Sequence, residues 1–159
     1  MEVDIKKTNA SEYSEIIEVW EASVRATHDF LSEEDIQFFK SKMASEYLPS
    51  VDLYIASVRD GEISAFMGLS PDKIEMLFVR PKCFGHGIGS RLIEFAINDC
   101  GIRKVDVNEQ NPSALKFYTN KGFHVIRRDE TDPSGKSFPI LHMSYITPEF
   151  EGTSTANRR

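Results

Sequence analysis

The sequence MLFVRPKCFGHGIGSR, residues 76–91, decides the fold that we expect for this chain. Residues 77–79 are typical of a buried strand, and Pro81 ends that strand. The glycine-rich run 85–89 follows, and the apolar residues of 90–100 then recur at helical spacing. The stretch therefore predicts a strand, a tight loop and a helix in direct succession.

The glycine-rich loop is suited to binding an anion. Glycines adopt positive φ and allow close approach of a ligand, and the positive end of a helix dipole follows. A phosphate or pyrophosphate is the expected ligand, and a sharp turn without a ligand is the alternative. Gly89-Ser90-Arg91 lacks the lysine of a P-loop, and Ser90 occupies the sixth position, where a dinucleotide fingerprint requires glycine.

The composition favours one soluble domain with a cationic partner. The 159 residues, 40% of them hydrophobic, suffice for one domain with a sizeable core. A net charge of −6 argues against nucleic-acid and anionic-membrane binding, because both need a basic face, and it suits an amine better. Cys83 and Cys100 are too few for a disulfide framework or a metal set. Without a signal peptide or a membrane-length apolar run, we expect a cytoplasmic protein.

Periodicity and turn residues predict an alternating order of elements in the rest of the chain. The expected order is a strand at 3–7, a helix from 10 that Asn9 and Glu12 cap as a box, a helix from Ser32 that stops before Pro49, strands at 53–59, 62–69 and 73–80, the helix at 90–100, a strand at 104–108, a helix from Asn111-Pro112 to Gly122, and strands at 123–129 and 138–145.

Two features complete this prediction. The helix behind the glycine loop should cross over the sheet, so that strands 73–80 and 104–108 are parallel while Asp60-Gly61 forms an antiparallel hairpin. A ligand should lie at the carboxyl end of that parallel pair. The polar tail 149–159 lacks periodicity and is predicted to be disordered.

A polar and aromatic corner lies between the first two helices. His28, Asp29 and Phe30 follow the end of the first helix there. These side chains suit a binding pocket in which the histidine titrates near neutral pH. Capping by Asp29 and packing by Phe30 explain the same residues without a ligand, and local sequence leaves both interpretations open.

These segments together carry a resemblance to a known family. Residues 84–92, the strand before them and residues 111–123 resemble the acetyl-coenzyme A site of the GNAT superfamily of N-acetyltransferases, whose element order matches residues 3–145. ATHDFL at 26–31 and VNEQN at 107–111 are similar to segments of small bacterial members. The resemblance implies a single α/β domain over residues 1–148, with a mixed, mostly antiparallel sheet and a central splayed parallel pair flanked by helices.

The resemblance also implies the residues that bind the cofactor, acetyl-coenzyme A. The family pattern Arg/Gln-x-x-Gly-x-Gly/Ala falls on Gly87 and Gly89, so the loop amides would bind the pyrophosphate, while the preceding strand and the 111–117 segment would hold the pantetheine arm. Phe84 stands where the pattern has Arg or Gln, and His86 or Arg91 would compensate. The implied cofactor contacts are Leu77, Phe78, Val79, Gly85, His86, Gly87, Ile88, Gly89, Ser90, Asn111, Ala114 and Phe117.

The implied chemistry is direct transfer of an acetyl group from acetyl-coenzyme A to a primary amine. Tyr118 occupies the position of the family tyrosine that protonates the departing thiolate. Glu75, which alternate spacing places on the face of Leu77 and Val79, and His28 are equal candidates for the general base.

Several other functional predictions accompany this chemistry. The corner residues His28, Asp29 and Phe30 would line the pocket of a small-molecule or peptide amine. The alternative that Phe84 supports is a protein that binds acyl-coenzyme A as a sensor without catalysis. The negative net charge disfavours a third function, a toxin that acts on transfer RNA. We expect no metal, and either a monomer or a homodimer.

Overall fold

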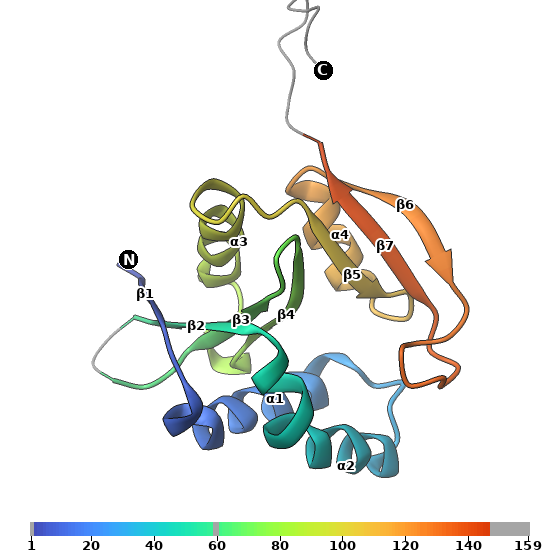
Figure 1. Ribbon diagram of the computed structural model, residues 1–159, viewed down its shortest axis with the longest axis horizontal. Helices are drawn as coiled ribbons and strands as arrows, with labels where there is room; N and C mark the ends of the chain where they lie inside the picture. The colour runs from blue at the N-terminus through green and yellow to red at the C-terminus, as the bar shows by residue number, and fades with distance from the viewer. Residues whose placement is uncertain (1, 59–60, 147–159) are drawn as a thin grey trace, which may run out of the picture. The chain divides into compact units, whose positions relative to one another are not determined.

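The computed structural model describes residues 2–58 and 61–146, which divide into two compact units, Met1–Asp106 and Val107–Arg159 (Figure 1). The first unit contains β1 (Asp4–Lys7), η1 (Ala10–Glu12), α1 (Tyr13–Thr27), α2 (Glu33–Lys42), η2 (Met43–Tyr47), η3 (Leu48–Ser50), β2 (Asp52–Ser57), β3 (Ala65–Leu69), β4 (Lys73–Val79), η4 (Pro81–Cys83), α3 (Ile88–Asn98) and the first residues of β5 (Lys104–Asn108). The second contains the end of β5, α4 (Pro112–Asn120), β6 (Phe123–Asp129) and β7 (Ile140–Tyr145).

The strands of the first unit form a mixed sheet, as predicted. β1, β2, β3 and β4 are antiparallel neighbours in that order. β4 and β5 are parallel, with Lys73 opposite Lys104 and Ile74 opposite Val105, which confirms the parallel pair that α3 connects. The hairpin turn predicted at Asp60-Gly61 and the tail predicted at 149–159 lie outside the described residues, apart from Gly61, whose φ of 96° suits a turn.

The main core of the first unit lies between helix α1 and the sheet. Ile16, Val19 and Trp20 of α1 are buried together with Phe66 of β3, and Met76 and Phe78 of β4 pack against them. Helix α2 contributes Ile36 to the same cluster. Burial of these apolar side chains holds α1 on the strands that lead to the glycine-rich loop.

The second helix ends earlier than the sequence predicted. α2 stops at Lys42, a π-type turn covers 43–47, and Pro49 lies inside the short helix η3. Pro49 is compatible with the start of a new turn because the first helical residues have no intrahelical acceptor for an N–H group. The start was correct, since the Ser32 hydroxyl accepts from Asp35 N at 3.0 Å and the Asp35 carboxylate accepts from Ser32 N at 3.1 Å.

The capping box predicted at Asn9 and Glu12 is wrong in one half. The Asn9 side chain does cap η1, because its Oδ1 accepts from Ser11 N at 3.0 Å. The Glu12 carboxylate, however, accepts from the Thr8 hydroxyl rather than from the Asn9 backbone.

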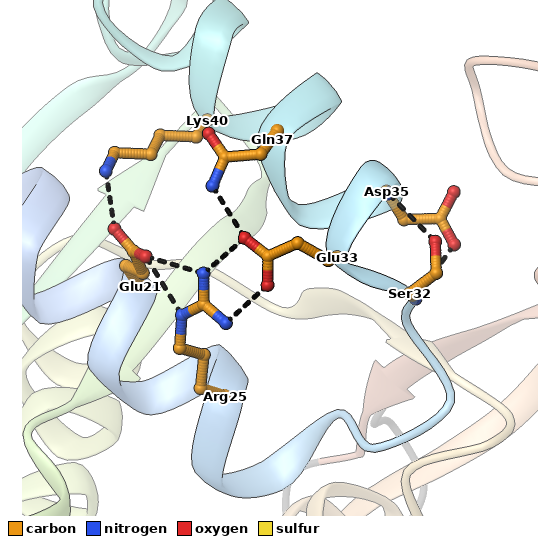
Figure 2. Close-up of polar contacts among 7 residues, drawn as sticks. All are labelled: Glu21, Arg25, Ser32, Glu33, Asp35, Gln37 and Lys40. Atoms are coloured by element: carbon orange, nitrogen blue, oxygen red, sulfur yellow. Dashed lines mark hydrogen bonds and ion pairs between the residues drawn. The ribbon is translucent and has the colours of Figure 1, made fainter.

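A network of charged side chains joins α1 to α2 on the two sides of the corner (Figure 2). Arg25 donates to both oxygens of Glu33 at 2.8 and 2.9 Å and to Glu21 at 2.9 Å. Lys40 lies 2.6 Å from Glu21, and Gln37 donates to Glu33 at 2.9 Å. The Arg25 guanidinium lowers the pKa of Glu33 to about 2. Exposed pairs of this kind contribute little stability singly. Together they link α1 with α2 through Glu21, Arg25, Glu33 and Lys40.

Candidate functional site

The glycine-rich loop and α3 have the geometry of an anion site. Gly85 and Gly87 have φ of 80° and 82°, as the sequence suggested for this loop, and Gly87 is the N-cap of α3. The first intrahelical bond runs from Arg91 N to Gly87 O at 3.1 Å, so the N–H groups of 88–90 precede the helical ladder. The first turn contains no acidic side chain. These donors and the helix dipole together favour a phosphate group.

Phe84 lies beside this loop with 42% of its surface exposed. Its ring therefore contributes little to the core, and the position remains accessible to a ligand. His86 and Arg91 are also exposed. The backbone of the loop is thus suited to a phosphate without the cationic or polar side chain of the family pattern.

Strand β4 carries a bulge at Glu75. Leu69 of β3 pairs with Ile74 and Gly68 pairs with Met76, so Glu75 is the extra residue on β4. The sequence prediction placed Glu75 on the face of Leu77 by regular alternation, but a bulge breaks that alternation and can re-aim a side chain. Glu75 is exposed, and its role stays a prediction.

The corner between α1 and α2 forms an aromatic cluster. The His28 ring lies 5.2 Å from the Phe30 ring and 6.3 Å from the Phe78 ring, and Phe78 stacks on Phe66 at 5.6 Å. Asp29, which lies between His28 and Phe30 in the sequence, is exposed. The structure therefore brings the corner residues next to β4, the strand predicted to contact the cofactor.

His28 is held by the last turn of α1. Its backbone N–H donates to Val24 O at 2.8 Å, and its Nδ1 lies 2.7 Å from the Thr27 hydroxyl oxygen. Among the described residues, Nε2 has no hydrogen-bond partner. Burial lowers the pKa of His28 below its ordinary value of 6.5, and the Asp29 carboxylate opposes that shift. The ring is therefore neutral at physiological pH. Thr27 had no role predicted from the sequence, although a threonine at a helix end can bond the carbonyl four residues before it, as Thr27 does with Ser23.

In the second unit, Asn111 begins α4 as predicted. Its Oδ1 accepts from Ala114 N at 3.2 Å, and Pro112 follows at the first helical position. Asn111 is only 8% exposed, and within the described ranges its Nδ2 group has no acceptor. A buried donor without a partner is costly, so a ligand carbonyl or phosphate oxygen would satisfy it.

Tyr118 lies in an aromatic cluster of the second unit. Its ring is 5.1 Å from Phe117 and 5.6 Å from Phe123, and the residue is 7% exposed. Burial raises the pKa of the Tyr118 phenol above its ordinary value of 10.0, so it keeps its proton at neutral pH. Buried tyrosines usually find a hydrogen-bond partner, yet among residues 2–58 and 61–146 this hydroxyl has none.

Among the described residues, no group of three or more His, Cys, Asp or Glu side chains is arranged for a metal ion. No helix in the same residues has the length and apolar character needed to cross a membrane.

Comparison with known proteins gives consistent matches. A family model described as the acetyltransferase (GNAT) domain matches residues 21–153. The peptidyl-lysine N-acetyltransferases YjaB of Salmonella typhimurium and Escherichia coli are each 36% identical to the chain, over 91% and 92% of it and 99% of their own lengths. The solution structure of apo YjaB from Escherichia coli matches with a TM-score of 0.84.

A more distant solved structure shares the fold. PaiA N-acetyltransferase from Thermoplasma acidophilum, solved in complex with coenzyme A, is 24% identical to this chain and matches it with a TM-score of 0.67. The match covers 91% of this chain and 100% of the PaiA chain.

Proposed function

The chain belongs to the GNAT family of acetyltransferases, and from this membership we propose that it acetylates the ε-amino group of lysine in peptides or proteins. It is an acetyl-coenzyme A dependent N-acetyltransferase, as the sequence predicted. The observation that carries the choice of acceptor is the near full-length similarity to two enzymes named for peptidyl-lysine.

The first unit carries the expected contacts for the pyrophosphate and the pantetheine arm of acetyl-coenzyme A. The amides of 85–90 at the N-terminus of α3 would bind the pyrophosphate, and the backbone of 77–79 would pair with the pantetheine arm. In the second unit, Asn111 Nδ2 would donate to the pantetheine arm or a phosphate, and Phe117 and Ala114 would pack on the cofactor. Within the described residues the Asn111 Nδ2 group has no acceptor, which supports this assignment.

Tyr118 would stabilise the leaving group. When the amine attacks the thioester carbonyl, the C–S bond breaks and its electron pair remains on sulfur as a thiolate. The neutral phenol of Tyr118 would donate its O–H to that sulfur, and the raised pKa keeps the donor protonated before the reaction. In the described part of the chain the Tyr118 hydroxyl has no hydrogen-bond partner, which supports this role because a ligand group would satisfy it.

His28 is the base that we favour. A lysine amine is protonated at neutral pH and must lose a proton before it attacks. His28 is neutral, and its Nε2 has no partner among the described residues. Glu75, exposed at the bulge of β4, remains the competing candidate.

Charge and aromatic contacts at the corner suit a lysine side chain. The exposed Asp29 carboxylate would attract the ammonium group, and the Phe30 ring would contact the aliphatic part of the side chain. The net charge of −6 adds a general attraction for basic peptides.

The test is acetylation of a peptide with a blocked N-terminus and one internal lysine. The full chain and acetyl-coenzyme A should give thiol release together with the mass gain of one acetyl group. The same peptide with arginine in place of lysine is the control. If only free small amines are acetylated, the peptidyl-lysine proposal is wrong.

Two variants test the base. His28→Gln should abolish the dependence of kcat/KM on a group that titrates below neutral pH, whereas Glu75→Gln should retain it. The opposite result would move the assignment to Glu75.

A further inference from the structure

We propose that Thr27 is a positioning residue that fixes the tautomer of His28 and leaves the lone pair on Nε2. This inference rests on the proposed role of His28 as the general base. Thr27 is the last residue of α1, and its hydroxyl lies between a backbone carbonyl of that helix and the imidazole ring.

The two contacts of the Thr27 hydroxyl determine where its proton lies. The hydroxyl oxygen is 2.8 Å from the backbone oxygen of Ser23 and 2.7 Å from His28 Nδ1. A carbonyl oxygen only accepts hydrogen bonds, so the single hydroxyl proton of Thr27 must point to Ser23. The contact with the ring then requires His28 Nδ1 to donate its own proton to Thr27.

A neutral imidazole carries one proton, so a proton on Nδ1 leaves Nε2 as the acceptor. This is the nitrogen without a partner in the described part of the chain. A neutral His28 with its proton on Nε2 could not accept a proton from an amine at that nitrogen. Thr27 would thus select the tautomer that is competent for catalysis.

Among the described neighbours of the His28 ring, one carries a charge, the Asp29 carboxylate. From the corner itself, the Asp29 carboxylate acts on the ring, and Phe30 is neutral. From α1, Thr27 is neutral, and from β4, Phe78 is neutral. Among these neighbours in the described residues, Thr27 is the one that makes a hydrogen-bonding contact with a ring nitrogen.

The tautomer can be measured directly by ¹⁵N NMR of the imidazole in the full chain. His28→Gln assigns the His28 signals among the four histidines. The wild-type ring should show the Nδ1–H tautomer above its pKa, and Thr27→Val, which keeps the side-chain shape but removes the hydroxyl, should shift the population toward Nε2–H. Thr27→Ser keeps the hydroxyl and should restore the wild-type pattern.

Kinetics provide the second measurement. Thr27→Val should lower the plateau of kcat/KM about twofold to tenfold, the effect expected for loss of one hydrogen bond. It should also move the acidic limb to lower pH, because Thr27 accepts a stronger hydrogen bond from the imidazolium than from the neutral ring. Thr27→Ser should restore both. A merely structural role would leave the position of the limb unchanged.

The outcomes separate this inference from the proposed function. A wild-type Nε2–H tautomer, or a Thr27→Val enzyme with an unchanged pH profile, overturns the role of Thr27 while acetylation of lysine peptides stands. A wild-type protein that does not acetylate the lysine peptide overturns the proposed function, whatever the NMR spectrum shows. The expected tautomer together with rescue by serine supports both.

Discussion

Replacement of Tyr118 by phenylalanine should separate stability from catalysis. The substitution removes one hydroxyl and leaves the ring in contact with Phe117 and Phe123. In the cofactor-free protein this hydroxyl is buried and has no hydrogen-bond partner among the described residues. Burial of an unpaired hydroxyl costs about 1–3 kcal/mol by mutational measures. Its removal should therefore stabilise the free protein by roughly 1 kcal/mol, equivalent to about 2–4 °C in Tm for a chain of this size.

The same substitution should reduce turnover strongly. Loss of a positioned proton donor lowers kcat by about 10²- to 10⁴-fold, whereas cofactor affinity should change little because the ring remains. Thermal unfolding without ligand measures the first effect, and thiol release with titration calorimetry of acetyl-coenzyme A measures the second. Glu75→Gln is the matched control that should not raise Tm.

The pH dependence of stability provides an internal check on Tyr118. The folded-state pKa of the phenol lies above its unfolded value of about 10, so the folded protein holds this proton more tightly. This contribution is fully present below pH 10 and is lost as pH rises from there through the folded pKa. The phenylalanine variant should lack that alkaline loss. A lower Tm for the variant would show that the hydroxyl has a partner, and a kcat within about tenfold of wild type would refute the assigned role.

Four further changes test the loop, the corner and its ion pairs. Phe84→Arg should lower the Kd for acetyl-coenzyme A about threefold to tenfold, and high salt should remove the gain; an unchanged Kd in calorimetry would contradict a phosphate near this position. In Gly87→Ala the added Cβ meets no atom within 4 Å, but the residue must keep a φ of 82°, so the free energy of unfolding should fall by about 1–2 kcal/mol and cofactor binding should weaken. The control Gly135→Ala, at φ 83° and with equal space, should lower the free energy of unfolding without changing cofactor binding. Arg25→Met should raise KM for the peptide without changing cofactor affinity, and the difference should shrink at high salt; equal KM values would show that the network does not orient the corner. Burial lowers the pKa of His28, so its contributions to kcat/KM and to the free energy of unfolding should be complete above pH 6.5 and lost as pH falls through the folded-state pKa. In His28→Gln, both pH profiles should become flat in this range.

Local signals in the sequence predicted the elements around the glycine-rich loop well. Gly101, with φ of 70°, lies just beyond α3, and Asn111 with Pro112 marks the start of α4. β5 has the predicted bounds, and the parallel pair follows from the short crossover. These features depend on φ preferences, capping and periodicity, which short stretches of sequence contain.

Features that depend on contacts between distant residues were not predicted. The bulge at Glu75 arises because Ile74 and Met76 pair with the consecutive residues Leu69 and Gly68 of β3. No pattern within the sequence of β4 indicates it. The contact of His28 with Phe78 joins residues on different elements. Helix α3 begins at Ile88, two residues earlier than predicted, and Ile88 and Leu92 are buried while Ile97 is half-buried, because packing on the sheet sets the phase of the helix.

The bulge at Glu75 also has a consequence for how this strand can diverge. On its two sides, Ile74 shares the face of Leu77, and Met76 shares the face of Phe78, as their partners on β3 require. Deletion of Glu75 would make Ile74 and Met76 consecutive residues of a regular strand, so both would keep their partners Leu69 and Gly68, and Ile74 would stay on the face of Leu77. Point substitutions at Glu75 and its deletion should therefore be tolerated in the fold, whereas deletion of Met76 would place the Glu75 side chain opposite Gly68, on the face of Phe78, and should be destabilising. Deep mutational scanning that includes single-residue deletions would show this asymmetry.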